Sequence, residues 1–521
     1  MSLPILYEDD HFIVVHKPHE LLTHASRPGE IGAVELASEA CGIKLGVHQR
    51  LDKATSGVIA FSKTEQGAER LAKAFELRNV RKIYRALVCR KPAAESGEWL
   101  HRLTHRDGRT FEDPQGKLCR SRYRVLRTYG PFALLELNLQ TGMTHQLRVQ
   151  CALAGCPILG DDLYGGGEFS QRLWLHAHKL RLLSEPNLPT FEASLPDLLD
   201  RPTLEMILRD ILENISRRID IPASDEAIRI AVPQHSGIPE VILEKLADML
   251  LIRHLEPEND TCWTEASLKV LANTAMKGFS CRDWAYRVHE APGKIHPCRQ
   301  FAQKFKNVPE PFFASEHGLK YQFDLSGNAT GLYLDQRENR AWVIRHAHGQ
   351  VLNLFAYTCA FSLCAAVSEK TEGTVSIDAA AAALRKGREN FEHNGLSLDG
   401  HRFITEDALK YLSRCAQNNT TFDTIICDPP SFGRAGKSVF SLDDALEDLL
   451  LACIRVAAPQ ATLLFSINHR KIRLQRLKKA FRQALSACGR SAECEEIFIN
   501  DDALGILGVG TDLKTIRATL Q

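Results

Sequence analysis

The feature of this sequence that most limits its possible folds is a regular alternation of short apolar strands and helices in its C-terminal part. From about residue 316, four stretches have the length and composition of buried strands: VLNLFAY, GTVSIDA, FDTIICDPP and ATLLFSINH. Helical runs such as AAAALRKGRENFEHNG separate them. This alternation is typical of an α/β unit with a doubly wound parallel sheet. We therefore predict such a unit for residues 313–521.

The N-terminal part has a different pattern. Short apolar strands dominate it: ILYEDDHFIVVHKP reads as two strands meeting at a turn, and GVIAFSK, IYRALVC and FALLELNLQ follow. Only SKTEQGAERLAKAFELRNV has a clear helical period. We therefore predict an α+β unit built mainly on a sheet for residues 1–190, which ends in the proline-punctuated stretch SEPNLPTFEASLPDLLDRP.

The segment between these two units has a third character. LEMILRDILENISRRI is an amphipathic helix, and VILEKLADMLLIRHLEP and WTEASLKVLANTAMKGF supply further strand or helix segments. This predicts a small α+β central unit over residues 203–312. Three units agree with the length of 521 residues, since a domain typically has about 150 residues.

Composition excludes several classes of protein. Hydrophobic residues make up 44% and charged residues 25%, as in a soluble globular protein. No apolar run reaches the roughly 20 residues that span a membrane, and the N-terminus lacks a secretory signal pattern. We therefore expect a cytoplasmic protein without a membrane partner. The 15 cysteines form no CxxC pair, which indicates free thiols and no metal site.

Charge is unevenly distributed. Residues 1–184 contain 26 Lys and Arg against 20 Asp and Glu, whereas the remaining residues contain 39 against 44. The stretch 81–128 alone has 13 basic and 5 acidic residues. A solvated face is the alternative interpretation, but a local excess of this size favours a polyanionic partner.

The string HQRLDKATSG, residues 48–57, has one carboxylate among bases in a polar loop. A salt-bridged surface loop is the alternative interpretation. The string resembles the HxRLDxxTSG signature of the RluA family of pseudouridine synthases. RKIYRALV, GMTHQLRVQCALAGCPILGDDLYGG and LWLHAHKL resemble further motifs of that family, in the same order. The resemblance covers about residues 4–184 and implies an α+β domain with a mixed, mainly antiparallel sheet that needs no cofactor.

The resemblance also implies roles for individual residues. Asp52 is the catalytic carboxylate, Tyr84 stacks on the uracil, and Arg148 forms an ion pair that keeps Asp52 charged. The resemblance implies that Arg50, His145 and Gln146 contact the RNA substrate. Arg50 would fill the gap left by a flipped base. Met143 departs from the family pattern, which usually has Arg or Lys there.

The C-terminal unit carries acids at two strand ends. Asp378 ends the strand GTVSID, where it could accept the ribose hydroxyls of an adenosine cofactor or cap a helix. Asp428-Pro429-Pro430-Ser431-Phe432 follows the strand FDTIIC. Two successive prolines form a rigid loop without amide donors. Its carbonyls and carboxylate suit a flat, donor-bearing partner such as a base.

Together these features resemble class I S-adenosylmethionine-dependent methyltransferases of the RlmI and RlmK type, over about residues 205–521. The resemblance implies a Rossmann-like fold and S-adenosylmethionine as cofactor. It implies cofactor contacts from Asp335, Gln336, Arg337, Asn353, Phe355, Tyr357, Thr358, Asp378, Asp407, Asp428 and Pro429. Pro430, Ser431 and Phe432 would contact the target base, with Asp428 also catalytic.

Two departures from this pattern bear on activity. Cys359 and Ala360 replace the usual glycines of the first cofactor loop, where glycine allows close backbone approach. Methylation of cytosine C5 needs a cysteine nucleophile, but FSINHRKI, residues 465–472, contains none. The N7 atom of guanine is already nucleophilic, so positioning could suffice. We therefore favour guanine N7 over cytosine C5.

The sequence thus predicts a bifunctional enzyme that isomerises uridine and methylates a base in RNA, with 23S rRNA favoured over tRNA. Two alternatives remain open: a methyltransferase half that only binds RNA, and a structural ribosome-associated protein. The oligomeric state is open, with a monomer plausible.

Overall fold

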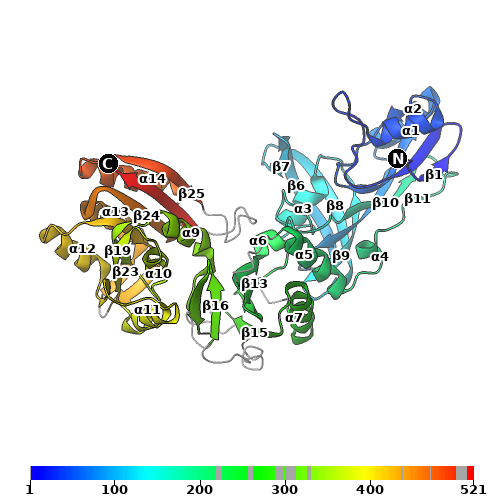
Figure 1. Cartoon of the computed structure of the whole chain (residues 1–521). Helices are drawn as coiled ribbons and strands as arrows, with labels where there is room; N and C mark the ends of the chain where they lie inside the picture. Colours follow the sequence, from blue (N-terminus) through cyan, green and yellow to red (C-terminus); the bar gives the residue numbers. More distant parts are fainter. Residues whose placement is uncertain are drawn as a thin grey trace.

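The computed structural model describes residues 2–218, 226–255, 262–288, 299, 312–324, 330–435, 438–469, 471–499 and 513–521. Figure 1 shows two lobes joined through a smaller central part. Each lobe is built on one large sheet, and the central part has a four-stranded sheet of its own.

The first sheet has eleven strands, in the order β1-β2-β4-β10-β5-β9-β8-β6-β7, with β3 beside β4 and β11 beside β10. Of its pairings, only that of β4 with β10 is parallel, which confirms the predicted mixed, mainly antiparallel sheet. The strands are β1 (Ile5–Glu8), β2 (Phe12–Lys17), β3 (Gly46–Val47), β4 (Ser56–Ser62), β5 (Val80–Val88), β6 (Ser96–Arg106), β7 (Arg109–Glu112), β8 (Lys117–Tyr129), β9 (Phe132–Leu139), β10 (Leu175–Leu182) and β11 (Phe191–Glu192).

Three helices accompany this sheet: α1 (Ala33–Cys41), α2 (Glu65–Glu76) and α3 (Gln146–Leu153). The predicted helix is α2, and Thr64 caps it by accepting a hydrogen bond from the Gly67 amide. The sequence analysis did not predict α1 and α3. Six of the eight residues of α3 are buried, polar ones included, so α3 has no polar face from which a helical period could be read.

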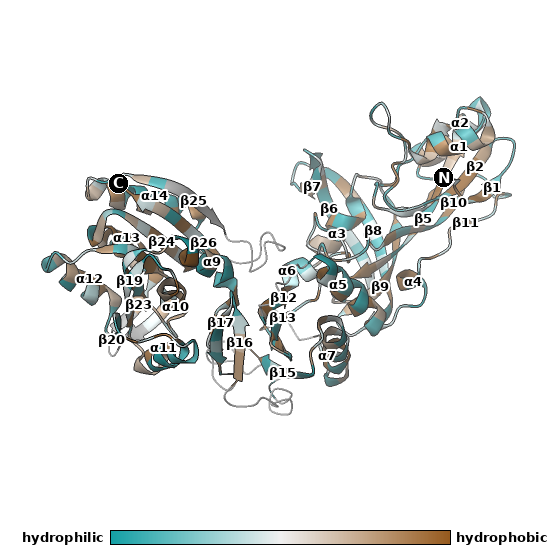
Figure 2. Ribbon diagram, in the orientation of Figure 1, coloured by the Kyte–Doolittle hydropathy of each residue, from teal (hydrophilic) through white to brown (hydrophobic). Residues whose placement is uncertain are grey.

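The central part continues the core of the first lobe. It contains α4 (Asp197–Asp200), α5 (Leu204–Arg218), β12 (Ala227–Ala231), α6 (Pro233–Ser236), β13 (Val241–Leu246), β14 (Met249–His254), α7 (Glu265–Phe279) and β15 (Asp283–Val288). Phe132 of β9 belongs to the same buried cluster as Ile211 of α5 and Leu271 of α7. Figure 2 shows the hydrophobic part of β9 beside α5. The first sheet and the central part therefore share one core.

The second lobe has a seven-stranded sheet in the order β20-β19-β18-β21-β24-β26-β25. Its first five strands are parallel, as predicted, and β26 is antiparallel to both of its neighbours. The strands of the lobe are β16 (Phe312–Glu316), β17 (Leu319–Phe323), β18 (Gly349–Leu354), β19 (Thr371–Asp378), β20 (His401–Thr405), β21 (Phe422–Cys427), β22 (Phe432–Ala435), β23 (Ser438–Ser441), β24 (Ala457–Asn468), β25 (Ala492–Ile499) and β26 (Leu513–Leu520). The helices are η1 (Leu334–Gln336), α9 (Arg337–His346), α10 (Ala360–Ala366), α11 (Ala381–His393), α12 (Ala408–Gln417), α13 (Leu442–Arg455) and α14 (Leu474–Ala487).

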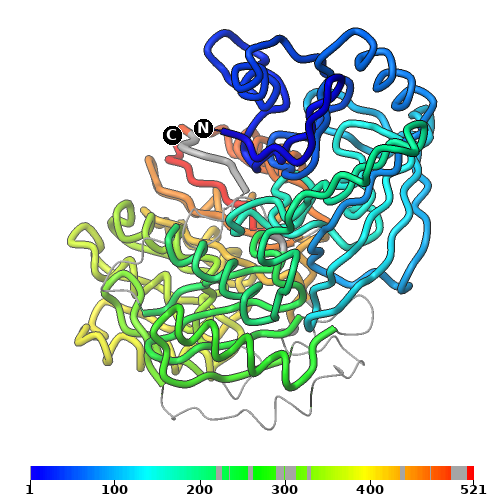
Figure 3. The backbone as a smooth tube through the Cα atoms, turned by 90° about the vertical axis from the view of Figure 1, so that its right-hand side faces the viewer, coloured from blue at the N-terminus to red at the C-terminus, as the bar shows by residue number. Residues whose placement is uncertain are grey.

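A second shared core joins the central sheet to this lobe. Leu251 of β14 and Ala285 of β15 lie in one buried cluster with Tyr321 of β17 and Leu334 of η1. Figure 3 shows the central residues, in green, below the blue N-terminal segment. Residues 300–311, which precede the predicted start of the third unit, lie outside the described residues. Among the described helices, none is both long and apolar enough to cross a membrane.

Candidate active sites

The first lobe has a pocket of about 630 Å³ around the loop that follows β3. Asp52, Tyr84, His145 and Arg148, which lie far apart in the sequence, all line this pocket. Sequence analysis placed these four residues at one site, and the fold brings them together.

The loop that carries Asp52 is held in place from both sides. Thr23 accepts a hydrogen bond from the Leu51 amide at 3.0 Å, and its hydroxyl donates to the Leu51 carbonyl at 2.9 Å. On the other side, the fully buried Lys17 donates from Nζ to the Lys53 carbonyl at 3.1 Å. Burial lowers the pKa of Lys17 to about 8, and the charge of Asp52 acts in the opposite direction. Asp52 is thus fixed at the backbone while its side chain stays 28% exposed to the pocket.

Tyr84 forms part of the wall of the pocket. It comes from β5, is buried, and pairs across the sheet with Ala177 of β10. Burial raises the pKa of the Tyr84 phenol above its ordinary value, and the nearby carboxylate of Asp52 adds to this effect. Tyr84 is therefore neutral at physiological pH and offers a flat ring beside the carboxylate. Arg50 also lines the pocket and is exposed.

The structure differs from the predicted pairing of Arg148 with Asp52. Arg148 donates from Nε and Nη2 to both oxygens of Asp161, at 2.8 and 2.6 Å. Asp161 is fully buried and cannot be hydrated, so its charge needs a cation more than the part-exposed Asp52 does. Arg148 still lines the pocket, and the charge of Asp52 helps to raise the pKa of Arg148. Arg148 therefore acts on Asp52 through the electric field, without a direct contact in this structure.

His145 is the residue that approaches Asp52 most directly among the predicted RNA contacts. Its Nε2 lies 4.0 Å from Oδ2 of Asp52. Its Nδ1 lies 3.0 Å from the hydroxyl of Tyr164, which accepts a hydrogen bond from the Thr110 amide at 2.8 Å. We assign the Tyr164 hydrogen to Nδ1, an assignment that leaves the proton of the neutral ring on Nε2. Burial lowers the pKa of His145, so this neutral ring directs an N–H group toward Asp52.

Two other residues of this segment have internal roles. The Gln146 side chain is buried and hydrogen-bonded to Thr141, Ser121 and the Arg120 carbonyl. Gln146 also lines the pocket, so its predicted contact with RNA stays a prediction, and its amide holds the turn before α3. Met143, where the family usually has a base, packs against a small apolar cluster that includes Leu103.

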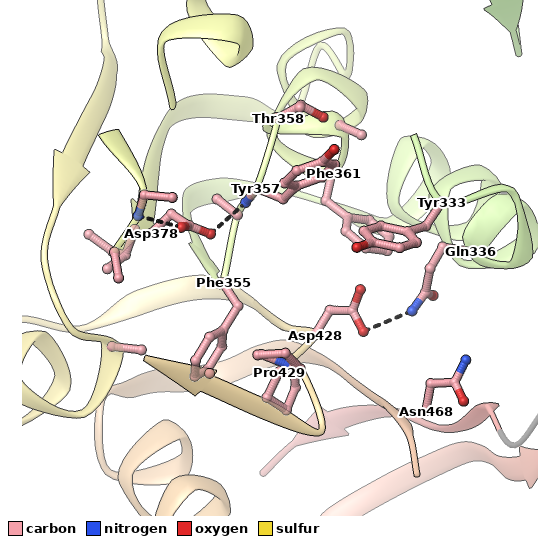
Figure 4. Close-up of a pocket in the computed structure, with 18 of the residues that line it drawn as sticks. Tyr333, Gln336, Phe355, Tyr357, Thr358, Phe361, Asp378, Asp428, Pro429 and Asn468 are labelled. Atoms are coloured by element: carbon pink, nitrogen blue, oxygen red, sulfur yellow. Dashed lines mark hydrogen bonds between the residues drawn. The ribbon is translucent and has the colours of Figure 1, made fainter. Parts of the chain in front are cut away.

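The second lobe has a pocket of about 570 Å³ at the carboxyl ends of β18, β19 and β21. Figure 4 shows Phe355, Tyr357, Asp378 and Asp428 around it. This is the edge at which a doubly wound sheet binds ligands. Five carboxylates line the pocket, and they are Asp335, Asp378, Glu406, Asp407 and Asp428.

The turn after β18 is held by Asp378. One oxygen of its carboxylate accepts from the Tyr357 amide at 2.8 Å, and the other accepts from the Ala380 amide at 2.8 Å (Figure 4). Phe355, Tyr357 and Cys359 all have positive φ angles, a conformation that favours glycine. Asp378 therefore both lines the pocket and stabilises a strained turn.

Cys359 fits this turn without filling the pocket. It is fully buried on the side of α11, where a Cβ on Gly387 would lie 2.4 Å from its Sγ atom. The lining of the pocket includes Ala360 but not Cys359. The absence of a side chain at Gly387 thus compensates for the cysteine that replaces the usual glycine.

Asp428 lies at the base of the pocket, with Gln336 beside it. Gln336 donates from Nε2 to Oδ1 of Asp428 at 2.9 Å (Figure 4). Burial raises the pKa of Asp428 to about 8, and the neighbouring carboxylate of Asp335 adds to the effect. One oxygen of Asp335 accepts from Asn468 at 3.3 Å, and the other is buried with no hydrogen-bond partner among the residues that the structure describes. These two carboxylates form an acidic floor that a cation would stabilise.

The remaining predicted residues divide into two groups. Asp407 caps α12 at the pocket edge, Thr358 donates to the Gly331 carbonyl at 2.5 Å, and Pro429, Pro430 and Ser431 also line the pocket. Asn353, Arg337 and Phe432 are not among the lining residues.

For two of these three, the structure corrects the predicted cofactor contact. Asn353 is buried beneath the turn and donates to Ser362 at 2.8 Å, and Arg337 lies 3.6 Å from the buried carboxylate of Glu316. Asn353 is 1% exposed and Arg337 is 3% exposed, so neither side chain is presented to the pocket. Phe432 is 70% exposed, at the start of β22.

Sequence analysis missed several lining residues. Tyr333 reaches this pocket from just before η1, and Phe361 and Asn468 reach it from α10 and β24 (Figure 4). Lys82 and Thr23 line the first pocket. The alternation of β5 places Lys82 on the same face as Tyr84 and could have identified it, whereas the others are residues that no motif of the sequence linked to these sites.

Two families match separate parts of the chain. Residues 11–153 match the family described as RNA pseudouridylate synthase. Residues 305–492 match the family described as S-adenosylmethionine-dependent methyltransferase. The first match contains Asp52, Tyr84 and Arg148, and the second contains all five carboxylates of the acidic pocket.

Similar proteins cover one part or the other. The ribosomal large subunit pseudouridine synthase C of Rickettsia bellii is 33% identical over 215 residues, which are 38% of this chain and 70% of that protein. A putative ribosomal RNA large subunit methyltransferase of Bacillus subtilis, YwbD, is 37% identical over 171 residues, or 32% of this chain. The chain spans only 43% of the length of YwbD.

A solved structure has the fold of the C-terminal part. It is SMU.776, a putative methyltransferase complexed with SAH, with a TM-score of 0.50 and 21% identity over 61% of this chain and 80% of that one. The chain thus belongs to the RNA pseudouridylate synthase family through its N-terminal lobe, and its C-terminal lobe is an S-adenosylmethionine-dependent methyltransferase domain.

Proposed function

We propose that the N-terminal pocket isomerises uridine to pseudouridine in RNA, with Asp52 as the catalytic carboxylate. The observation that carries this proposal is that Asp52 is the one carboxylate among the described residues that line the pocket, which also contains Arg50, Lys53, Lys82 and Arg148. The reaction breaks the N-glycosidic bond, turns the uracil and rejoins it through C5. A carboxylate fixed by its backbone beside a flat, neutral ring suits this reaction, since the ring of Tyr84 can hold the detached uracil.

We propose that the C-terminal pocket binds S-adenosylmethionine, which when bound supplies a methyl group on a positively charged sulphonium. The five carboxylates fit such a cation. Asp378 and Asp407 lie at the ends of β19 and β20, where they are placed for the adenosine, and Asp335 and Asp428 lie at the floor, where they are placed for the charged end. The position of Cys359 away from the pocket supports an active methyltransferase over one that only binds RNA.

Guanine N7 is the proposed methyl acceptor. Among the described residues, no cysteine lines the pocket. Cys427, which precedes Asp428, is fully buried, and burial raises its pKa well above the ordinary value, so it does not supply a thiolate. Methylation of cytosine C5 requires such a thiolate, whereas guanine N7 requires only positioning. Cytosine C5 remains the second candidate because one cysteine of the chain, Cys298, lies outside the described residues.

The proposed substrate is large-subunit (23S) rRNA in both reactions, with tRNA as the alternative. The relatives named above carry the ribosomal large subunit in their names for each half of the chain. The basic excess of the N-terminal lobe supports an RNA partner of this kind. We propose a cytoplasmic location on the same basis.

The test is to incubate the purified chain with unmodified 23S rRNA, with and without S-adenosylmethionine, and to analyse the nucleosides by mass spectrometry. We expect pseudouridine in both samples and 7-methylguanosine only with the cofactor. 5-Methylcytosine would move the proposal to cytosine C5. Pseudouridine alone, together with no heat of S-adenosylmethionine binding by calorimetry, would contradict the methyltransferase proposal. Modification of tRNA but not rRNA would overturn the proposed substrate.

A further inference from the structure

One face of the central sheet has an unusual group of arginines. Arg229 of β12 pairs in register with Glu244 of β13, and Arg253 of β14 pairs with Arg287 of β15. The alternation of side chains along a strand places Arg253 on the same face as Leu251, and Arg287 on the same face as Ala285. Leu251 and Ala285 pack in the core shared with the methyltransferase lobe. The arginines therefore lie on the face of the central sheet that is turned toward that lobe.

The carboxylate of Glu244 pairs with two arginines of this group. Oε1 of Glu244 accepts from Arg229 at 3.2 Å and from Arg253 at 3.2 Å, and Glu244 is 3% exposed. Arg287 forms no ion pair with any residue that the structure describes and is half-buried. Burial lowers the pKa of Arg287, the adjacent Arg253 lowers it further, and the carboxylates of Glu244 and Asp324 act in the opposite direction. Like charges side by side in a half-buried position are unfavourable unless an anion joins them.

The group lies next to the methyltransferase pocket. Arg253 and Arg287 both act electrostatically on Tyr333, and Arg287 also acts on Tyr357. These two tyrosines line the pocket, their rings lie 5.4 Å apart, and Tyr333 is 53% exposed. Leu332 and Leu334, on either side of Tyr333, belong to the same buried cluster as Leu251 and Ala285. The face that carries the two arginines is thus turned toward the Tyr333 side of the pocket.

An RNA substrate has an electrostatic difficulty at this pocket. Its phosphates are repelled by the five carboxylates that line it, whereas the base must enter. A cation pair at the rim would offset that repulsion, because two guanidinium groups provide bidentate donors for phosphate oxygens.

We propose that Arg253 and Arg287 form a phosphate-binding site for the RNA backbone next to the nucleotide that is methylated. This inference rests on the proposed function of the methyltransferase lobe, and it names the part of the chain that holds its substrate. The central sheet would then do more than connect the two lobes, since it would position the RNA over the acidic pocket.

The test compares the full chain with Arg287→Gln, and uses Arg282→Gln as a matched control. Arg282 lies at the surface, just before β15. Its side chain is 87% exposed, and it forms an ion pair with Asp248. Binding of unmodified 23S rRNA is measured by filter retention at several salt concentrations. We expect Arg287→Gln to weaken binding and to reduce the slope of log affinity against log salt by about one. Arg282→Gln is expected to leave the slope unchanged.

The methylation assay shows whether Arg287 binds an RNA phosphate or the carboxylate of S-adenosylmethionine. Arg287→Gln should raise the KM for RNA about tenfold and leave both the KM for S-adenosylmethionine and the rate of pseudouridine formation unchanged. Arg287→Lys, which keeps the charge, should restore the salt slope. A wild-type salt slope in Arg287→Gln would overturn the inference, and so would a raised KM for S-adenosylmethionine alone, since the arginine would then bind the cofactor carboxylate. The filter-retention measurement of RNA binding does not depend on methylation. Failure of the methyltransferase proposal would instead appear as an absence of methylated product with the wild-type chain.

Discussion

The two pockets of this protein have opposite charge. The N-terminal pocket surrounds one carboxylate with cations, whereas the C-terminal pocket places five carboxylates around a cavity of similar size. A single ionised acid among cations suits a nucleophile that acts on a polyanion. Many acids without free cations suit a positively charged cofactor. Each of the two proposed reactions thus has a pocket with its own electrostatics.

The pockets also fix their acids in different ways. Asp52 is on a loop held by the hydroxyl of Thr23 and the ammonium group of Lys17, and its own carboxylate is left for the substrate. Asp378 uses both oxygens for backbone amides: one accepts from Tyr357 in the turn that shapes the cofactor pocket, and the other accepts from Ala380, two residues after Asp378. A catalytic acid must be free to react, whereas a binding acid can also be structural.

The largest expected effect is on Asp52. We expect Asp52→Asn to reduce pseudouridine formation by at least about a thousandfold, because the amide keeps the shape but is not a nucleophile. Methylation of the same RNA should continue, since the second pocket is separate. Single-turnover assays of both products on 23S rRNA would measure this. Normal pseudouridine formation in the variant would contradict the proposed role of Asp52 as the catalytic acid, and with it the contrast between the two pockets.

The next effect concerns Asp428, whose pKa is raised to about 8. Below that pH the carboxyl is protonated, and above it the carboxylate is charged and favours a cation. The affinity for S-adenosylmethionine should therefore rise with pH up to about pH 8, by at most about tenfold per unit, and then level off. Calorimetry between pH 6.5 and 9 would measure it.

Asp428→Asn supplies the control for this titration. Its affinity should be independent of pH over that range, and its methylation rate should fall about a hundredfold. A wild-type affinity that does not change with pH would show that the acidic floor does not hold the sulphonium.

The third prediction tests whether His145 supports Asp52. His145→Leu removes the N–H group that faces Asp52 at 4.0 Å and should lower the rate of pseudouridine formation about fivefold, since the contact is longer than a hydrogen bond and is worth about 1 kcal/mol. His145→Gln can present an amide N–H near the position of Nε2 and should retain most of the activity. Single-turnover rates would compare the two variants. Equal loss in both would indicate that His145 serves only to shape the loop.

The smallest expected effect is on the cofactor turn. Gly387→Ala places a methyl group 2.4 Å from Sγ of Cys359, so we expect unfolding of the second lobe to need about 1–3 kcal/mol less free energy. Thermal melting would record a lower Tm, and pseudouridine formation should persist. The double variant with Cys359→Gly removes the clash and should recover the Tm. If Gly387→Ala melts like the wild type, Cys359 is not packed as described.

Much of the fold could be predicted from the sequence, because local patterns carry it. The apolar alternation of FIVVHK and GVIAFS, and the strands VLNL and TIIC, form the sheets expected of them. The short α3 was missed because it is buried on all sides. The packing of Phe132 against α5, which unites the first lobe with the central part, joins residues too far apart in sequence for any local pattern to reveal.

In the candidate sites, too, some features could be predicted from the sequence and others could not. The sequence by itself determined the residue types that carry the chemistry, because Asp52, Tyr84, Asp378 and Asp428 lie in short motifs whose spacing is set by strand and loop lengths. Only the tertiary structure decided the partners: Arg148 pairs with Asp161 instead of Asp52, Gly387 makes room for Cys359, and Arg253 and Arg287 lie beside the pocket of another lobe. The physical reason is that charge pairing and packing depend on distance and burial in three dimensions, and neither can be read from sequence separation.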